Sequence, residues 1–473
     1  MPGSFHKTRL NRNRSGVFLP ISTCITGTDE IPPLPQTEKQ RRAEREILKF
    51  SEHYSSILGM DRRDFLKTAC GMAAAFMAMN AVYGPLFNVD PAEAANPDVT
   101  AGRRNSLSRQ FIFDVQTHFV RGKYEWKGLL QLRKAAQRWN PKLKGETLTA
   151  EKIQYDNFVR EVFLESDTTL ALLSSAPSDN PEGWFIRNDD MARTRKMFNE
   201  KAGSKRLFSH AVITPGQPRW LDELDRAISE YKPDSWKGYT VGSPSTFSKY
   251  PWRLDDEKLV YPAYEKMEKA GIMNVCIHKG LISPEAKKLS NSTWRYGNVD
   301  DVGRAAKDWP HLNFIIYHSA LERIGEPNRH DLDTFEKTGY IPWVSDLART
   351  PEQYSVANVF AELGTVFATT VISNPRYCSG ILGTLIKGLG VDHVLWGTDS
   401  VWYGSPQWQI EAFRRIEIPK DLQKNFGFLS LGSADGMVRK AILGLNAARL
   451  YRLNAEKLVE GSGDTIRMLK EKV

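Results

Sequence analysis

Four polar residues of the sequence each stand at the end of a short apolar run. They are His118, His278, His318 and Asp399. Three histidines and one carboxylate form a nitrogen and oxygen ligand set that suits Zn(II) or another divalent first-row metal. One such histidine taken alone is more often a structural residue, but the same arrangement at four run ends indicates a shared site.

The first apolar run carries two further polar groups. Alternation with period two in a strand places Asp114, Gln116 and His118 on one face. Gln116 stands where a metal-binding strand end of the form Asp-x-His-x-His carries a histidine. Its amide oxygen is a harder, neutral donor, so Gln116 either ligates the metal or orients water bound beside it. The third interpretation is a lost metal site in a barrel that is kept for binding.

The elements that must position these residues follow from the alternation of apolar runs with segments of helical periodicity. Eight candidate strands lie at 111–117, 168–173, 207–213, 236–241, 273–277, 313–317, 356–363 and 393–397. Candidate helices lie between them at 151–164, 191–201, 220–231, 258–270, 299–308 and 381–389. This pattern predicts a (β/α)8 barrel, in which the strand C-terminal ends carry the chemistry. Long loops at 242–254 and 319–353 are expected to cap that face.

Composition excludes several other classes of protein. The chain has 473 residues, 41% of them hydrophobic, with 12 tryptophans, which is enough for one large buried core. The net charge of +9 is spread along the chain without a dense basic block, so no nucleic-acid partner is expected. Only Cys276 and Cys378 follow residue 95, which excludes a disulfide framework and a cysteine zinc site.

The N-terminal part resembles a targeting sequence and contains no candidate catalytic residues. Residues 1–59 are polar and predict an unpacked extension, or a start codon assigned too early, with translation beginning at Met60. Residues 60–95 combine Arg62-Arg63, an apolar stretch too short to span a bilayer, and Ala92-Glu-Ala94, which is typical of a twin-arginine signal peptide. We therefore expect the twin-arginine machinery to export the folded chain to the periplasm or medium. Residues 96–473 then form a single barrel with capping loops and C-terminal helices.

Residues from about 110 to 455 resemble the amidohydrolase-related family of the amidohydrolase superfamily. Besides the 114–118 and 236–240 segments, three motifs carry this resemblance: Val275-Cys-Ile-His-Lys-Gly280, Phe314-Ile-Ile-Tyr-His-Ser319 and Leu395-Trp-Gly-Thr-Asp-Ser400. The branch includes aminocarboxymuconate semialdehyde decarboxylase and related metal-dependent hydrolases. The resemblance implies one metal, usually zinc, held by His118, His278 and Asp399, with His318 as a catalytic group beside it. Gln116 departs from the family pattern at the first ligand position.

The chemistry that such a site implies is metal-activated water. A divalent ion, Zn(II) or else Mn(II) or Fe(II), makes hydroxide available near neutral pH, while Asp399 moves its proton and His318 stabilises the oxyanion or protonates the leaving group. The first prediction is hydrolysis of an amide, lactone or ester of a small molecule. The alternative is non-oxidative decarboxylation of an unsaturated or aromatic carboxylate. A second alternative is an exported barrel without catalysis.

Three further residues are candidates for substrate contacts. Lys237 lies in the fourth strand run and could meet substrate or Asp399; a carboxylated lysine bridging two metals is disfavoured by the glutamine at position 116. Arg376 could hold a substrate carboxylate with two parallel hydrogen bonds, although a surface role fits its loop as well. Trp402 could line an aromatic pocket. Homodimers are common on this fold, and the sequence leaves that state open.

Overall fold

The computed structural model describes residues 19–25, 34–124, 134, 137, 147, 149–243, 246–282, 287–288, 292–323, 326–402, 404–460 and 464–470. Eight parallel strands form one sheet in the order β1-β2-β3-β4-β7-β8-β9-β10. They are β1 Phe113–Thr117, β2 Leu170–Leu173, β3 Leu207–Ile213, β4 Ser235–Tyr239, β7 Asn274–His278, β8 Asn313–Tyr317, β9 Val359–Glu362 and β10 Val394–Leu395. Each overlaps a strand predicted from the apolar runs, so the prediction of a (β/α)8 fold is confirmed.

The sheet closes between its first and last strands. Thr117 and Ser400 form a parallel bridge. The amide of Val115 donates to the carbonyl of Trp396 at 3.0 Å, and the amide of His118 donates to the carbonyl of Ser400 at 2.7 Å. This seam brings the end of β1 against the segment that follows β10, which is where two of the predicted site residues lie.

Apolar side chains fill the interior of the barrel below the strand ends. They include Phe113, Val115, Leu172, Phe208, Ile315, Phe360 and Leu395. The C-terminal segment closes the opposite end of the barrel with η9 (Ala441–Leu445) and α20 (Asn446–Leu450). The ring of Tyr451, just after α20, lies 5.3 Å from Phe113 and 5.8 Å from Phe208 between centroids. The barrel is therefore a packed core, and its C-terminal mouth is the end left for chemistry.

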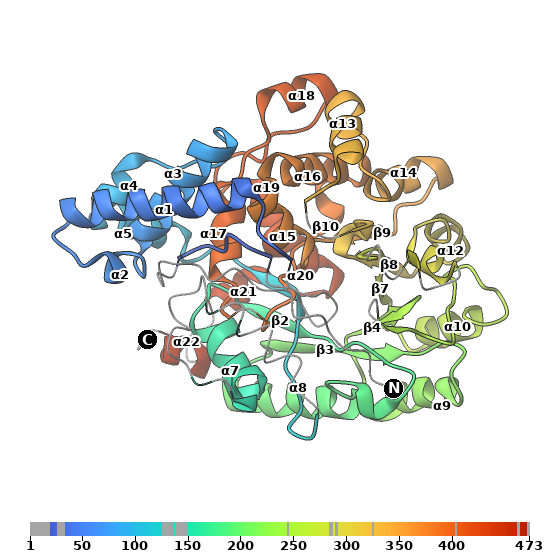
Figure 1. Ribbon diagram of the computed structural model, residues 1–473. Coiled ribbons are helices and arrows are strands. Elements are labelled where there is room, and N and C mark those ends of the chain that lie inside the picture. The colour runs from blue at the N-terminus through green and yellow to red at the C-terminus, as the bar shows by residue number, and fades with distance from the viewer. Residues whose placement is uncertain are drawn as a thin grey trace, which may run out of the picture.

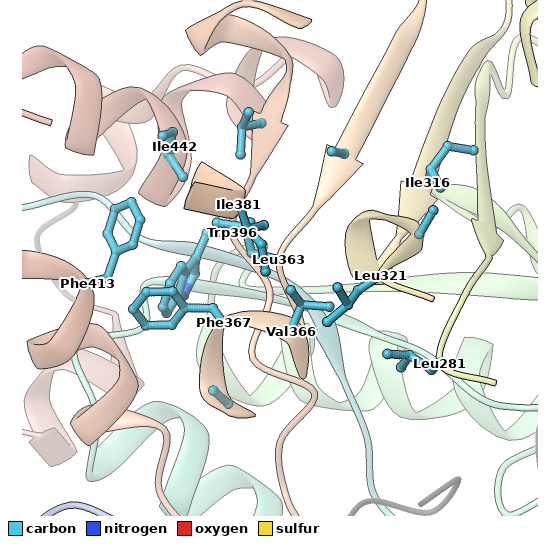
Figure 2. Packing of buried hydrophobic residues seen from close by; sticks show 14 of the residues in the cluster. Leu281, Ile316, Leu321, Leu363, Val366, Phe367, Ile381, Trp396, Phe413 and Ile442 are labelled. Carbon is cyan, nitrogen blue, oxygen red and sulfur yellow. The ribbon is translucent and has the colours of Figure 1, made fainter. Parts of the chain in front are cut away.

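Helices surround the barrel and bury its outer face (Figure 1). They are α7 Tyr155–Phe158, α8 Asn188–Ala202, α9 Trp220–Arg226, α10 Tyr261–Lys269, α12 Val302–Asp308, α13 Arg329–Thr338, α14 Val344–Tyr354, α15 Val366–Ser373, α16 Pro375–Leu389, α17 Gln407–Arg415 and α18 Lys420–Phe426. Figure 2 shows Phe367 of α15 and Phe413 of α17 packed around Trp396, with ring centroids 5.1 to 5.4 Å apart. Short helices α19 Met437–Lys440, α21 Ala455–Glu460 and α22 Thr465–Lys470 complete the C-terminal part.

Two segments predicted as loops contain regular structure. Residues 319–353 hold all of α13 and most of α14, where Asn328 caps the first helix through the amide of Asp331. Residues 242–254 include a two-stranded hairpin, β5 Gly242–Ser243 and β6 Thr246–Phe247. The two helices are amphipathic, with Phe335, Val344 and Leu347 buried, but polar residues dominate the segment and favoured a loop. Strands of two residues are too short to show a period.

The N-terminal part forms a helical layer on one side of the barrel, drawn in blue in Figure 1. Its helices are α1 Glu38–Ile57, α2 Arg62–Phe65, α3 Ala69–Tyr83, α4 Pro91–Ala95 and α5 Pro97–Leu107. The prediction of an unpacked extension is wrong for residues 34–59, because α1 packs along α3 and buries Ala43 and Ile47. Residues 1–18 and 26–33 of that extension lie outside the described residues. Within the described part, no helix combines the length and apolar character needed to cross a membrane.

Candidate active site

The β1 and β10 side of the mouth is a closed hydrogen-bond group around Asp399. Its Oδ1 accepts from His118 Nε2 at 2.7 Å and from Gln116 Nε2 at 2.9 Å. Its Oδ2 accepts a short hydrogen bond from the hydroxyl of Thr365, which follows β9. All four side chains are at most 1% exposed. Burial raises the pKa of Asp399, but the hydrogen bond and charge of His118 outweigh it, so the net pKa is lowered and the carboxylate stays ionised.

His118 faces an acceptor on both sides of its ring. Nδ1 lies 2.9 Å from the carbonyl of Ser174, and Nε2 lies on the Asp399 carboxylate. Neither partner oxygen carries a hydrogen, so the ring donates in both bonds, as an imidazolium does. Trp402 stacks on this ring at 5.6 Å with an 18° interplanar angle, and Phe185 meets it edge-on at 5.4 Å. Trp402 thus holds His118 in place and is itself 1% exposed.

The backbone at the strand ends is strained where it presents these groups. His318, Thr365 and Asp399, which follow β8, β9 and β10, have φ values of 60°, 60° and 58°. Side chains other than glycine seldom adopt this left-handed region, and such strain gathers at functional sites. The three residues are therefore held in place by the barrel against a local conformational cost.

The opposite side of the mouth, at the ends of β4, β7 and β8, is held by ring contacts. Tyr239 stacks on His278 at 4.7 Å, and His278 meets the ring of His318 at 4.6 Å. Lys237 Nζ lies 3.3 Å from the ring centroid of Tyr317 and 5.2 Å from that of Tyr239. The side chains of Lys237, His278 and His318 are fully buried. Aromatic faces can stabilise a desolvated ammonium group in such a position.

His318 presents a free lone pair to this side of the mouth. Its Nδ1 lies 2.8 Å from the carbonyl of Gly364, so this nitrogen carries the hydrogen. Burial lowers the pKa of His318 to about 4, so the ring is neutral at pH 7. Nε2 is then an unprotonated acceptor, and it has no hydrogen-bond partner among the described residues. It is therefore an open hydrogen-bond acceptor, while the lowered pKa means that burial disfavours its protonation.

Glu362 at the end of β9 joins the two sides, and the sequence argument did not single it out. Its carboxyl accepts from the amides of His318, at 3.1 Å, and Gly364, at 2.5 Å. Burial raises its pKa to about 8, so the acid is protonated at neutral pH. A Cβ built on Gly364 would lie 2.5 Å from Glu362 Oε1 and also 2.5 Å from Gln116 Oε1. Both oxygens thus border the same point, so they lie close to each other. The sequence signal that could have identified Glu362 is an acidic residue at the end of an apolar run, as in Phe360-Ala-Glu-Leu.

A buried polar chain below the mouth fixes the ring of Tyr317. Its hydroxyl donates to the carbonyl of Val115 at 2.7 Å, so it must accept from His210 Nε2 at 3.0 Å. His210 Nδ1 then accepts from the hydroxyl of Ser235 at 2.8 Å, and Ser235 accepts from Tyr451 at 3.0 Å. Every hydrogen bond in this chain is donated in the direction of Val115. The hydroxyl of Tyr317, whose ring lies under Lys237, is therefore fixed both by the bond it donates and by the bond it accepts.

The remaining predicted residues have partners other than Asp399, although Asp114 also accepts from the amide of Gln116 at 3.2 Å. Asp114 accepts from the amide of Thr398 at 3.0 Å and from its hydroxyl, so it anchors the β10 segment and does not join Gln116 and His118 at Asp399. The β1–β2 register shifts between Asp114 and Thr117, which is why the three residues do not share one partner. Burial raises the pKa of Asp114 to about 7. Arg376 forms ion pairs with Glu336 and Asp421 on the surface, and the structure does not bring it to the mouth.

The predicted metal ligands are of the right chemical kind but do not gather into one cluster. His118, Gln116 and Asp399 lie together, whereas His278 lies against His318 and Tyr239. Among the residues that the structure describes, no three His, Cys, Asp or Glu side chains are placed so that they could hold a metal ion. The two donor atoms nearest each other, His118 Nε2 and Asp399 Oδ1, are already joined by a hydrogen bond. This arrangement does not fit a metal without rearrangement, and metal binding stays a prediction.

A cavity of about 220 Å³ adjoins the mouth on the β3 and β4 side. Tyr239 and Trp252 form the wall nearest the site, and the indole of Trp252 donates to the carbonyl of Tyr239 at 2.9 Å. Because the other face of Tyr239 lies on His278, this cavity is separated from the buried mouth by one aromatic ring.

Comparison with known proteins places the chain in a family. The profile of the amidohydrolase family matches residues 187–453, which is more than half of the chain. The chain belongs to the amidohydrolase family. The matched part of the chain contains His278, His318 and Asp399 and begins after β1. The β1 end, where Gln116 departs from the expected histidine, thus lies outside the match.

Solved structures of distant sequence are similar to this chain, while no protein of curated function matches it. An uncharacterised TIM-barrel protein from Bordetella bronchiseptica is 15% identical, covering 72% of this chain and 98% of that chain with a TM-score of 0.48. The 5-carboxyvanillate decarboxylase from Sphingomonas paucimobilis is 14% identical (73% and 100% covered, TM-score 0.41). The dihydroxybenzoic acid decarboxylase from Polaromonas sp. JS666, solved with bound manganese, is 16% identical (72% and 97% covered, TM-score 0.41). The fold assignment rests on the strand order and the family match.

Proposed function

We propose that this chain is a decarboxylase that removes CO2 from a small unsaturated or aromatic carboxylate. The observation that carries the proposal is Lys237, whose side chain is fully buried over the rings of Tyr317 and Tyr239. A buried ammonium group is a strong binding point for a carboxylate that has left water behind. The sequence favoured hydrolysis, with decarboxylation as the alternative, and this proposal reverses that order.

Burial of the mouth favours loss of CO2. A carboxylate held by Lys237 in a site where the polar side chains are at most 1% exposed has lost its hydration shell. Losing CO2 moves the negative charge from the carboxylate to the carbon, and protonation of that carbon then removes it, so the two steps together relieve a cost that binding imposes. Hydrolysis, in contrast, consumes a water molecule that this mouth must first admit.

The mouth also holds the proton that decarboxylation consumes. The bond between the substrate carbon and its carboxylate breaks, CO2 leaves, and the electron pair stays on the carbon, which takes up one proton. Glu362, protonated up to about pH 8, and the doubly donating ring of His118 are the two acids in reach of the mouth. Solvent restores the proton after product leaves, so the reaction balances without an oxidant or reductant.

One observation favours hydrolysis as a second candidate. The Nε2 of His318 is neutral, buried and without a partner among the described residues, so it can accept a hydrogen bond from a water molecule and orient that water for attack. In that reaction the products are an acid and an amine or alcohol, and no CO2 appears.

Isotopes distinguish the two functions in one experiment. The purified chain is incubated with a panel of aromatic and unsaturated carboxylates and with matched amides, esters and lactones, in D2O and in H2(18)O. We expect CO2 and a product with one deuterium on the carbon that lost it. Incorporation of (18)O into a carboxylate product without CO2 would contradict decarboxylation and favour hydrolysis. Lys237→Met is expected to raise KM for the active substrate about 10- to 100-fold, because it removes the cation that binds the carboxylate.

A further inference from the structure

We propose that residues 60–95 stay in place as a structural layer of the working enzyme, docked on the outer face of the barrel, and are not removed as an export leader. This inference concerns the N-terminal layer alone and does not depend on the reaction. Residues 60–95 have the pattern of a twin-arginine signal peptide, so the two interpretations predict opposite fates for the same residues.

Backbone hydrogen bonds join the segment to the end of α17. Phe87 and Ile416 form an antiparallel bridge. The amide of Asn88 donates to the carbonyl of Arg415 at 2.7 Å, and the amide of Glu417 donates to the carbonyl of Leu86 at 2.8 Å. Pairing of this kind satisfies backbone groups that would otherwise be buried without partners.

Asn80 holds the turn that makes this pairing. Its Nδ2 donates to the carbonyl of Phe87 at 2.7 Å, and its Oδ1 accepts from the amides of Leu86 and Phe87 at 3.0 and 2.9 Å. Gly84, with φ of 96°, allows the chain to leave α3 toward the barrel at this point. An export leader that is removed after transport does not require a turn fixed by three side-chain hydrogen bonds from one asparagine.

A buried ion pair closes the interface. Arg415 donates to both oxygens of Glu93, at 3.1 and 2.5 Å, and both side chains are at most 7% exposed. Burial raises the pKa of Glu93, but the hydrogen bonds and charge of Arg415 outweigh it, and the net pKa is lowered. The guanidinium of Arg415 also donates to the carbonyl of Asn88 at 3.3 Å. Loss of either partner would leave the other buried charge with only a longer ion pair, Glu93 with Arg103 or Arg415 with Glu411, each at 3.6 Å, which is unfavourable.

The predicted cleavage site is part of this interface. Ala92-Glu-Ala94 lies in the helix α4, which Asp90 and Glu93 cap reciprocally, and Ala94 has no exposed surface. Ala92 and Asn96 are exposed, but Glu93 and Ala94 are buried and the backbone of this turn is hydrogen-bonded, which disfavours proteolysis. The apolar residues of the signal motif are equally hidden, since Phe65 and Leu66 are at most 1% exposed.

The apolar stretch itself packs as a core helix. In α3 the residues Cys70, Ala73, Ala74, Ala75, Phe76, Ala78 and Met79 are buried, and Phe76 lies 5.0 Å from the ring of Phe87. α1 covers the other side of α3, so α3 has neighbours on two faces. Removing residues 60–94 would expose both partner surfaces to water.

The deciding experiment is the mass of the mature chain. The full chain is expressed in a host with working twin-arginine export, the active fraction is purified, and its N-terminus is read by intact mass and sequencing. We expect residues 60–95 to be present, whether the chain begins at Met1 or at Met60. A mature chain that begins at Ala95 or Asn96 would overturn the proposal.

Limited proteolysis tests the ion pair directly. Glu93→Gln is expected to accelerate cleavage between residues 84 and 96 on the order of 100-fold, because the open state of the layer becomes more populated. Arg45→Gln is the matched control, since it breaks an exposed ion pair with Glu38 in the same layer and should leave the rate unchanged. Equal cleavage rates in wild type and Glu93→Gln would count against a docked layer.

Discussion

The two sides of the barrel mouth are built in different ways. At β1 and β10, Asp399 is surrounded by three donors, and the group around it is closed. At β4, β7 and β8, stacked rings hold Lys237, His278 and His318, and His318 Nε2 has no partner among the described residues. A closed hydrogen-bond group resists rearrangement, whereas an open lone pair beside a cation accepts a ligand. We infer that the second side meets substrate and the first supplies charge and protons.

The largest expected effect comes from Asp399→Asn on the closed side. Loss of its charge removes the partner of His118 and places an amide NH2 against donors, so we expect kcat to fall by about a thousandfold or more. Asp392→Asn, which changes an exposed carboxylate just before β10, is the control and should be neutral. If Asp399→Asn keeps a tenth of wild-type kcat, the closed side is structural only.

His318→Asn tests the open side. We expect kcat/KM to fall about 100-fold or more because the hydrogen-bond acceptor that this side offers to substrate, His318 Nε2, is removed. In the wild type, activity should be lost as the pH falls through about 4, where His318 becomes protonated, and this acid limb should disappear in the variant. His330→Asn, an exposed histidine of α13, serves as the control. A variant profile that keeps the acid limb would assign it to another group.

Gln116→His tests whether the closed side can be converted into a metal site. The amide now donates to Asp399, and an imidazole would offer a nitrogen that first-row metals prefer. We expect affinity for Zn(II) or Mn(II), measured by calorimetric titration, to rise about 10- to 100-fold. Gln353→His, an exposed glutamine of α14, should leave it unchanged. An unchanged affinity in Gln116→His would place any metal away from β1.

Glu362 links the two sides and should make stability depend on pH. Burial raises its pKa from 4.5 to about 8, so between these values the folded chain keeps a proton that the unfolded chain has lost. Its contribution is therefore complete below about pH 4.5 and is lost as the pH rises to about 8, with a slope on the order of 1 kcal/mol per pH unit in the free energy of unfolding.

Glu362→Gln removes this dependence because an amide does not titrate. Denaturant unfolding at a series of pH values should show a slope shallower than that of wild type by this amount. Glu352→Gln, at an exposed site in α14, is the control. Identical slopes in wild type and Glu362→Gln would show that the carboxyl ionises normally in the fold.

The smallest effect is expected outside the mouth, at Arg376. Its ion pairs with Glu336 and Asp421 are partly exposed, and such pairs contribute less than about 1 kcal/mol to the free energy of unfolding. We expect Arg376→Gln to leave kcat/KM unchanged and to lower the melting temperature slightly. A tenfold rise in KM would return Arg376 to the substrate site.

The positions of the strands were predictable because each buried strand coincides with a short run rich in apolar residues, although polar residues interrupt β1, β3 and β4. His278 ends β7, and His318 and Asp399 follow β8 and β10, as expected from that pattern. Glu362 was not predicted, because its raised pKa comes from neighbours on other strands. The helical layer of residues 38–107 was not predicted either, since the same apolar stretch fits a signal peptide and a buried helix equally well.

The sequence by itself determined the eight strands, the order of the βα units and the polar residues at the strand ends, because these depend on local periodicity along the chain. Only the tertiary structure decided which of those residues meet. The seam between β1 and β10 joins His118 to Asp399, while the stacking of Tyr239 keeps His278 with His318. Contacts of this kind depend on side-chain directions and burial summed over distant segments, which no single stretch of sequence contains.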